Sequence, residues 1–247
     1  MIRNIPNIIT CCNLICGCIA TLSGFEHHFT NAFIFILLGA LFDFLDGFTA
    51  RLLKVSGKMG IELDSLADVI TFGMAPAAMV FTLFTRVCYP EMIYSPFWFA
   101  VLPCTAFLIP AFSALRLAKF NIDERQHTTF IGLPTPANAI FWASLISSSE
   151  AFLCSQRFNA PFLLAFVVLF CWLLVCEVPM FSLKFKSLKW EDNKLRFSYL
   201  ILSAAILLCA ALSGADEGQT WQSMSRALAF CLGLYPLVNI LKSAWRL

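Results

Sequence analysis

Four aspartates lie in two stretches of sequence that are otherwise apolar enough to enter a membrane. They are Asp43, Asp46, Asp64 and Asp68. A carboxylate at membrane depth costs about 2.5 to 3.5 kcal/mol even on a lenient insertion scale, so these side chains need water, a metal ion or one another. Hard carboxylate oxygens with no His or Cys nearby suit Mg²⁺ or Mn²⁺. The residues therefore predict a site for divalent cations.

Helical spacing places these aspartates on two stripes. Residues three, four and seven apart share one face of a helix, and a short connection at residues 54–60 favours antiparallel neighbours whose stripes face each other. Four converging carboxylates suit two cations about 3.5 to 4 Å apart, which is the arrangement that assists in-line phosphoryl transfer. One stripe consists of Asp43, Asp46, Gly47 and Ala50, and the other of Gly60, Asp64 and Asp68.

The composition is that of a polytopic membrane protein. Hydrophobic residues make up 60% of the chain and charged residues 13%, whereas soluble proteins carry roughly 25% charged residues. The apolar runs lack the strict alternation of a lipid-facing barrel, so we expect an all-α bundle of about eight transmembrane helices and no sheet. The runs that can cross a bilayer fall near residues 9–26, 31–53, 61–85, 94–117, 133–154, 160–181, 196–213 and 223–244.

Basic residues predict how the bundle is oriented, because short loops rich in Lys and Arg stay in the cytoplasm. Of the 17 Lys and Arg residues, only Arg86, Arg157 and Arg226 fall on the other side of the predicted spans. We therefore expect an integral protein of the cell membrane with both termini cytoplasmic and an acidic site that opens to the cytosol. The basic face suits anionic lipid head groups, and nucleic acid is not indicated.

No repeat or low-complexity stretch divides the chain. We expect one membrane-embedded domain over residues 1–247, with a motif-bearing core at about 1–181. Residues 182–247 then supply a polar cytoplasmic loop and two further spans. Most of the 11 cysteines read as small apolar residues. Cys88 and Cys154 approach the side opposite the cytosol, where the sequence leaves a disulfide open.

The complete spacing D-x2-D-G-x2-A-R-x8-G-x3-D-x3-D, from residue 43 to residue 68, resembles the signature of the CDP-alcohol phosphotransferase family without departures. Members of this family transfer a phosphatidyl or phospho-alcohol group from a cytidine diphosphate ester to an alcohol, and release CMP. The resemblance implies a homodimer with two Mg²⁺ or Mn²⁺ ions on the four aspartates. It also implies that Asp68 is the base that deprotonates the acceptor hydroxyl.

The same resemblance implies a pocket for the cytidine diphosphate group. Small side chains would leave room for the ligand, and an arginine would hold phosphate. The residues concerned are Gly47, Ala50, Arg51 and Gly60. Asn7 and Thr10, at the start of the first predicted helix, are candidates for phosphate binding at a helix N-terminus, and simple helix capping is the alternative.

Further polar stretches at residues 6–13, 62–77, 116–121 and 130–139 resemble the membrane-embedded phosphatidylserine synthases, a branch of that family. This resemblance covers roughly residues 1–140 and implies that CDP-diacylglycerol and L-serine give phosphatidylserine and CMP. The candidates for serine binding are Arg116, Lys119, Asn121 and Thr135. Arg116 and Lys119 have an alternative reading as membrane anchors, and Thr135 as part of a Pro-rich helix start.

Two rival functions remain open. Glycerol 3-phosphate or inositol phosphate as acceptor would keep the chemistry, but a phosphorylated acceptor calls for more basic residues than Arg116, Lys119 and Arg125 supply. An ion-coupled transporter also places carboxylates at membrane depth. The aspartates crowd one end of their helices, however, and residues 34–40 and 69–76 offer almost no polar path beyond them.

Overall fold

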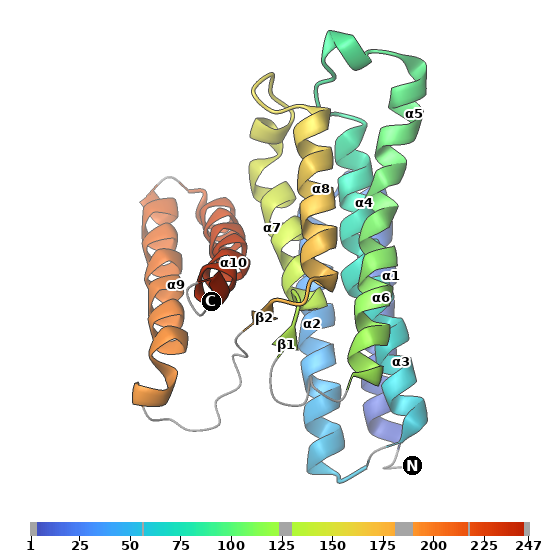
Figure 1. The fold of residues 1–247 in the computed structure, drawn as a ribbon, viewed down its shortest axis with the longest axis vertical. Coiled ribbons are helices and arrows are strands. Elements are labelled where there is room, and N and C mark those ends of the chain that lie inside the picture. The colour runs from blue at the N-terminus through green and yellow to red at the C-terminus, as the bar shows by residue number, and fades with distance from the viewer. Residues whose placement is uncertain (1–3, 56, 124–129, 181–189, 217, 245–247) are drawn as a thin grey trace.

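The structure is a computed structural model that describes residues 4–55, 57–123, 130–180, 190–216 and 218–244 (Figure 1). Its N-terminal part comprises α1 (Ile5–Phe25), α2 (Phe29–Leu52), α3 (Lys58–Asp68), the π-helical turn η2 (Val69–Met74) and α4 (Ala75–Phe84). The middle comprises the short 3-10 turn η3 (Glu91–Ile93), α5 (Pro96–Cys104), the 3-10 turn η4 (Thr105–Phe107), α6 (Leu108–Ile122), α7 (Thr135–Leu153) and α8 (Ala160–Val175). The chain continues through α9 (Trp190–Asp216) and α10 (Thr220–Ala244). The predicted all-α class is confirmed.

Within the described residues, six helical segments are long and apolar enough to cross a membrane, and the chain is an integral membrane protein. They are Ile5–Phe25, Phe29–Leu52, Lys58–Phe84, Pro96–Ile122, Asn193–Ala215 and Thr220–Ser243. The other two predicted spans correspond to α7 and to α8, which is a shorter apolar helix. The predicted span 160–181 is too long, because α8 ends at Val175 and extended backbone leads to Pro179, which cannot continue a helix.

Prolines mark where several helices begin and change. Pro6 and Pro161 occupy the first turn of α1 and α8, where the missing N–H would have no intrahelical partner. Pro76 lies where η2 passes directly into α4. Asn159 caps α8, because its Oδ1 accepts a hydrogen bond from the backbone N–H of Phe162 at 3.2 Å. These residues set the ends of the helices that build the bundle.

A two-residue antiparallel pair contradicts the expectation that no sheet would form. In it, β1 (Phe130–Ile131) pairs with β2 (Pro179–Met180). The turn after β1 depends on Gly132, whose φ of +76° places it in the left-handed region. A Cβ at this position would lie 2.6 Å from the carbonyl oxygen of Leu174. The pair therefore fastens the start of α7 to the end of α8.

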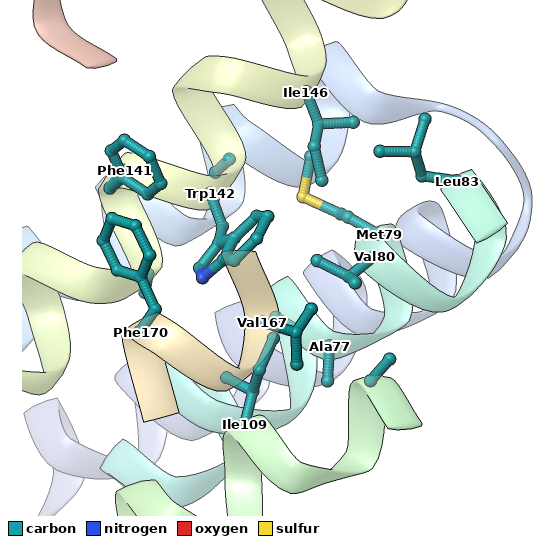
Figure 2. Packing of buried hydrophobic residues seen from close by; sticks show 14 of the residues in the cluster. Ala77, Met79, Val80, Leu83, Ile109, Phe141, Trp142, Ile146, Val167 and Phe170 are labelled. Atoms are coloured by element: carbon teal, nitrogen blue, oxygen red, sulfur yellow. The ribbon is translucent and has the colours of Figure 1, made fainter. Parts of the chain in front are cut away.

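The hydrophobic core surrounds α4, which is buried along almost its whole length. Figure 2 shows Trp142 of α7 between the stacked rings of Phe141 and Phe170 on one side and Met79 of α4 on the other. Trp142 and Met79 have no solvent exposure. The core therefore joins the elements that follow α4 to the N-terminal helices that carry the aspartates.

The C-terminal helices form a hairpin at the side of this bundle. Figure 1 shows α10 next to α7, with α9 further out. The most apolar stretch of α9 buries none of its residues against the rest of the chain. The hairpin therefore contacts the bundle through α10.

Figure 1 shows the N-terminus, the α2–α3 connection and the end of α6 at one end of the molecule, and the α4–α5 and α7–α8 connections at the other. This agrees with the chain path expected from the basic residues. Six of those basic residues lie outside the described part of the chain, which also omits most of the polar loop predicted after residue 181. They are Arg3, Arg125, Lys184, Lys186, Lys189 and Arg246.

Candidate active site

Three aspartates converge where α2 faces α3. Asp43 of α2 and Asp64 and Asp68 of α3 each offer a carboxylate oxygen, and these oxygens lie within 4.8 Å of one another. Asp68 is buried, whereas the other two are half-buried. The spacing of three or four residues on each helix gives this convergence, because it aligns the side chains on one face. The arrangement concentrates negative charge that needs a cation.

Asp46 lies beside this group and contacts α1. The hydroxyl of Thr10 donates a hydrogen bond to Oδ2 of Asp46 at 2.6 Å, and the same hydroxyl lies 3.0 Å from the carbonyl oxygen of Pro6. Both Thr10 and Asp46 are buried. Thr10 was predicted to meet the phosphates of a donor; in the structure its hydroxyl instead donates a hydrogen bond to a site carboxylate.

Asn13 is a site residue that the sequence analysis did not single out. It is wholly buried, its Nδ2 lies 3.4 Å from Oδ1 of Asp68, and its carbonyl oxygen accepts a hydrogen bond from the Thr71 hydroxyl at 3.0 Å. A spacing signal was present, because Pro6, Thr10 and Asn13 lie four and three residues apart on the buried face of α1.

A cavity of about 420 Å³ opens beside the aspartates. Its wall includes five of the six residues predicted to bind the donor, and two of the aspartates. Those residues are Asn7, Thr10, Gly47, Ala50, Gly60, Asp46 and Asp64. A Cβ on Gly47 would meet no atom within 4 Å, whereas a Cβ on Gly60 would lie 3.3 Å from Oδ1 of Asn7. The small residues therefore leave open space on one wall and allow close packing on the other.

Arg51, the sixth predicted donor residue, does not line this cavity. Its side chain is exposed, and its Nε donates a hydrogen bond to the carbonyl oxygen of Gly47 at 3.0 Å. The guanidinium is thus held over the last turn of α2, one helical turn beyond Gly47. A donor phosphate would have to reach this position from the cavity.

The four residues predicted to bind serine occupy different environments. Arg116 is buried on α6, donates from Nη1 to Oγ1 of the wholly buried Thr135 at 3.3 Å, and interacts electrostatically with Asp68. Asn121 is exposed and donates to Oγ of Ser65, next to Asp64, at 2.9 Å. Lys119 is exposed beside a second cavity, of about 470 Å³, that Arg116 also lines. The structure brings Arg116 and Thr135 together, and places Lys119 and Asn121 further out.

Two more buried polar residues lie on the same helix faces as Arg116 and Thr135. Ser113 precedes Arg116 by three residues on α6, and Asn138 follows Thr135 by three residues on α7. Both are wholly buried, and within the described residues neither Oγ of Ser113 nor the amide group of Asn138 has a hydrogen-bond partner. Their spacing could have drawn attention to them, because it continues the stripes of two residues that were predicted.

The chemistry of the aspartate group fits a hard divalent cation. All its ligand atoms are oxygens, and Oδ1 of Asp64 is buried without a hydrogen-bond partner among the described residues. Such an orphaned carboxylate oxygen is costly unless a cation or water meets it. Oxygen ligands without nitrogen or sulfur favour Mg²⁺ or Mn²⁺ over zinc.

Comparison with known proteins agrees with this class of site. A family model described as CDP-alcohol phosphatidyltransferase matches residues 3–178, which include α1 to α8. The chain therefore belongs to the CDP-alcohol phosphatidyltransferase family. It is accordingly a membrane-embedded phosphotransferase whose aspartate signature lies on α2 and α3.

Curated relatives carry a more specific name. The chain is 39% identical to the CDP-diacylglycerol–serine O-phosphatidyltransferase of Bacillus subtilis over 132 residues, which are 53% of this chain and 69% of that protein. The Helicobacter pylori protein of the same name is 28% identical over 239 residues, covering 96% and 90% of the two chains. The protein of that name from Saccharomyces cerevisiae is 43% identical over 125 residues, covering 47% and 41%.

Proposed function

We propose that this protein transfers the phosphatidyl group of CDP-diacylglycerol to the hydroxyl of L-serine, giving phosphatidylserine and CMP. The observation that carries the chemistry is the convergence of Asp43, Asp64 and Asp68 beside the 420 Å³ cavity. The choice of serine rests on the relatives that share this activity in their names. It agrees with the buried cation of Arg116 near the aspartates.

Asp43, Asp46, Asp64 and Asp68 would hold two divalent cations, Mg²⁺ or Mn²⁺. Once bound, such ions neutralise the charge of the diphosphate and of the oxygens that attack and leave. Asp46 would join the other three from its position beside them, where Thr10 orients one of its oxygens.

The cavity would receive the cytidine diphosphate part of the donor, with the acyl chains in the surrounding lipid. The open wall at Gly47 and Ala50 gives a flat ligand access to the backbone of α2. Asn7 would donate hydrogen bonds at the start of α1, and Arg51 would hold a phosphate at the outer end of α2. Positioning of this kind supplies much of the rate in phosphoryl transfer.

Asp68 would act as the base. The serine oxygen attacks the phosphorus that carries the diacylglycerol, the bond from that phosphorus to the CMP oxygen breaks, and the hydroxyl proton passes to Asp68. The amide of Asn13 contacts Oδ1 of Asp68 and would orient the carboxylate for this step. Asn13 is thus a positioning residue.

Arg116 would bind the serine carboxylate. Its Nη1 contacts Thr135, and its buried Nε has no hydrogen-bond partner among the described residues. A guanidinium binds a carboxylate strongly, because its planar fork can donate two parallel hydrogen bonds to it. Lys119 and Asn121, which are exposed near the end of α6, would line the route by which serine approaches.

We further propose that the site faces the cytosol from the cell membrane, with both termini cytoplasmic. The support is that the N-terminus, the α2–α3 connection and the end of α6 lie at one end of the molecule, together with many of the basic residues (Figure 1). A homodimer is the assembly expected from the family resemblance.

The test uses purified protein with CDP-diacylglycerol, Mn²⁺ or Mg²⁺, and separate acceptors, while CMP release is measured. Serine should give the fastest release. Faster release with glycerol 3-phosphate or inositol phosphate would refute the serine assignment and leave the family chemistry intact. Ion flux across sealed vesicles without any CMP would instead identify a transporter.

A further inference from the structure

A third cavity, which is mostly apolar, lies between α7, α8 and α10, away from the aspartates. Its volume is about 460 Å³, and carbon-rich side chains make up almost all of its wall, including Phe141, Phe166, Phe170 and Leu237. Ligand sites typically span about 300 to 1,000 Å³. This cavity is therefore large enough for part of a lipid and too apolar for a nucleotide or an amino acid.

The cavity is elongated along α10. The residues of α10 that line it run from Arg226 to Ile240, a helical length of about 21 Å at about 1.5 Å per residue. Midway along it, Gly233 brings α10 close to α7, because a Cβ there would lie 3.4 Å from the ring of Phe141. The floor is formed by the stacked rings of Phe141 and Phe170, whose centroids are 4.2 Å apart (Figure 2). We call this feature the α8–α10 groove.

One cation stands at the end of the groove near the start of α10. Arg226 lines the groove and is exposed. Among the residues that the structure describes, its hydrogen bonds reach only its own helical turn, at 3.4 Å from Nε to the Gln222 carbonyl oxygen and 3.5 Å from Nη2 to Oγ of Ser223. Because both are long, the guanidinium retains donors for another ligand.

The position of Arg226 selects the leaflet. Arg226 lines the groove together with Ser149, which lies four residues before α7 ends at Leu153. Figure 1 shows that α7 ends at the α7–α8 connection, opposite the end with the α2–α3 connection next to the aspartates. The groove thus combines a long apolar channel with a guanidinium at the end that is nearer the α7–α8 connection. That combination matches one acyl chain attached to a phosphate.

We propose that the α8–α10 groove binds an anionic phospholipid of the leaflet opposite the active site, with one acyl chain in the groove and its phosphate on Arg226. The lipid fills the space between α10 and the bundle, and so holds the α9–α10 hairpin in place. This matters for the hairpin because the apolar stretch of α9 contributes no buried residue of its own. The proposal depends on the membrane fold and not on the acceptor used in catalysis.

The test compares phosphatidylglycerol with phosphatidylcholine of the same acyl chains. Binding to the detergent-purified protein is measured by native mass spectrometry, and thermal stability is followed in parallel. We expect phosphatidylglycerol to bind more tightly and to raise the unfolding temperature more. Arg226→Ala should weaken phosphatidylglycerol binding about fivefold, which is the effect of one cation near anionic lipid, and should change phosphatidylcholine binding little. Arg157→Ala, an exposed cation in the α7–α8 connection, is the matched control and should change neither.

A second pair of variants tests the groove itself. Leu237 lines it and is 55% exposed, so Leu237→Trp should fill it and reduce the binding of both lipids. Leu208→Trp, on α9 at a position that is 61% exposed and outside the groove, should leave binding unchanged. Leu169→Trp, at a groove position of α8 that is 47% exposed, replaces Leu237→Trp if that variant does not fold. CMP release shows that each variant retains its active fold.

Several results would overturn the proposal. Equal binding of the two lipids to the unchanged protein would remove the role of charge, as would equal losses in Arg226→Ala and Arg157→Ala. Stabilisation by inorganic phosphate alone would remove the role of the acyl chain. Conversion of a dimer to a monomer by Leu237→Trp, with lipid binding unchanged, would show that a second copy of the chain covers the groove.

Discussion

The amide of Asn13 on α1 contacts the carboxylate of Asp68 on α3, with 3.4 Å between Nδ2 and Oδ1. Asn13 is itself held by its place in the fold, because it is wholly buried and its carbonyl oxygen accepts a hydrogen bond from Thr71. The first helix thus orients the residue that we propose as the base. A buried amide with a fixed backbone is well suited to hold one carboxylate rotamer.

Asn13→Ala should therefore lower kcat by about tenfold to a hundredfold, the range seen when a partner that orients a site ligand is lost. The KM for CDP-diacylglycerol should change little, since Asn13 does not line the donor cavity. Initial rates of CMP release would measure both constants. Thr21→Ala is the control, because the side chain of Thr21 donates its hydrogen bond within α1, to the carbonyl oxygen of Gly17. A proportional loss of kcat in both variants would mean that α1 packing, and not the Asp68 contact, is responsible.

Asp68→Asn should abolish turnover while donor binding largely remains. The substituted amide keeps the size of the side chain but cannot accept the hydroxyl proton at neutral pH. CMP release would report the chemical step, and isothermal titration with CDP-diacylglycerol in the presence of Mn²⁺ would report binding. Asp43→Asn provides the comparison, since a residue that only binds cations should lose donor affinity and turnover together. Loss of both properties in Asp68→Asn would assign Asp68 to cation binding alone.

The helical class and the aspartate pairs could be predicted from sequence, because each depends on local regularities. Apolar runs of span length form helices in a membrane, and a period of three or four residues puts Asp64 and Asp68 on one face. Five of the predicted donor residues line one cavity because they occupy the two helices that carry the aspartates, and the start of α1 beside them.

Contacts between helices that are distant in sequence were harder to predict from the sequence. Asn13 and Asp68 are 55 residues apart, and no local pattern states which face of α1 meets α3. The β1–β2 pair was missed because two-residue strands have no periodicity to detect. The span predicted at residues 160–181 ends too late because its apolar run continues past Val175, where α8 ends. The hydrogen bond from Arg116 to Thr135 depends on how α6 meets α7, which spacing within either helix does not determine.

Gly17→Ala should destabilise the protein and lower its activity. A Cβ at this position would lie 2.8 Å from Cα of Thr71, so α1 would have to move away from η2. Overpacking of this kind costs about 1 to 3 kcal/mol. It would also disturb the contact between Thr71 and Asn13. Thermal unfolding in detergent would show a lower midpoint. Gly57→Ala is the matched control, because a Cβ there meets nothing within 4 Å, and an unchanged midpoint in Gly17→Ala would contradict the packing of α1 against η2.

Arg116→Lys should raise the KM for serine by about tenfold or more and leave the KM for CDP-diacylglycerol nearly unchanged. Lysine keeps the positive charge near Asp68 but cannot contact Thr135 and a carboxylate with the planar fork of arginine. Rates of CMP release at varied serine concentration would measure the effect. Lys119→Ala is the control, because Lys119 is exposed and only flanks the second cavity, so its effect on the serine KM should be small. If Lys119→Ala raised the serine KM more than Arg116→Lys, serine would be recognised at the exposed end of α6, and Arg116 would have a structural role behind the aspartates.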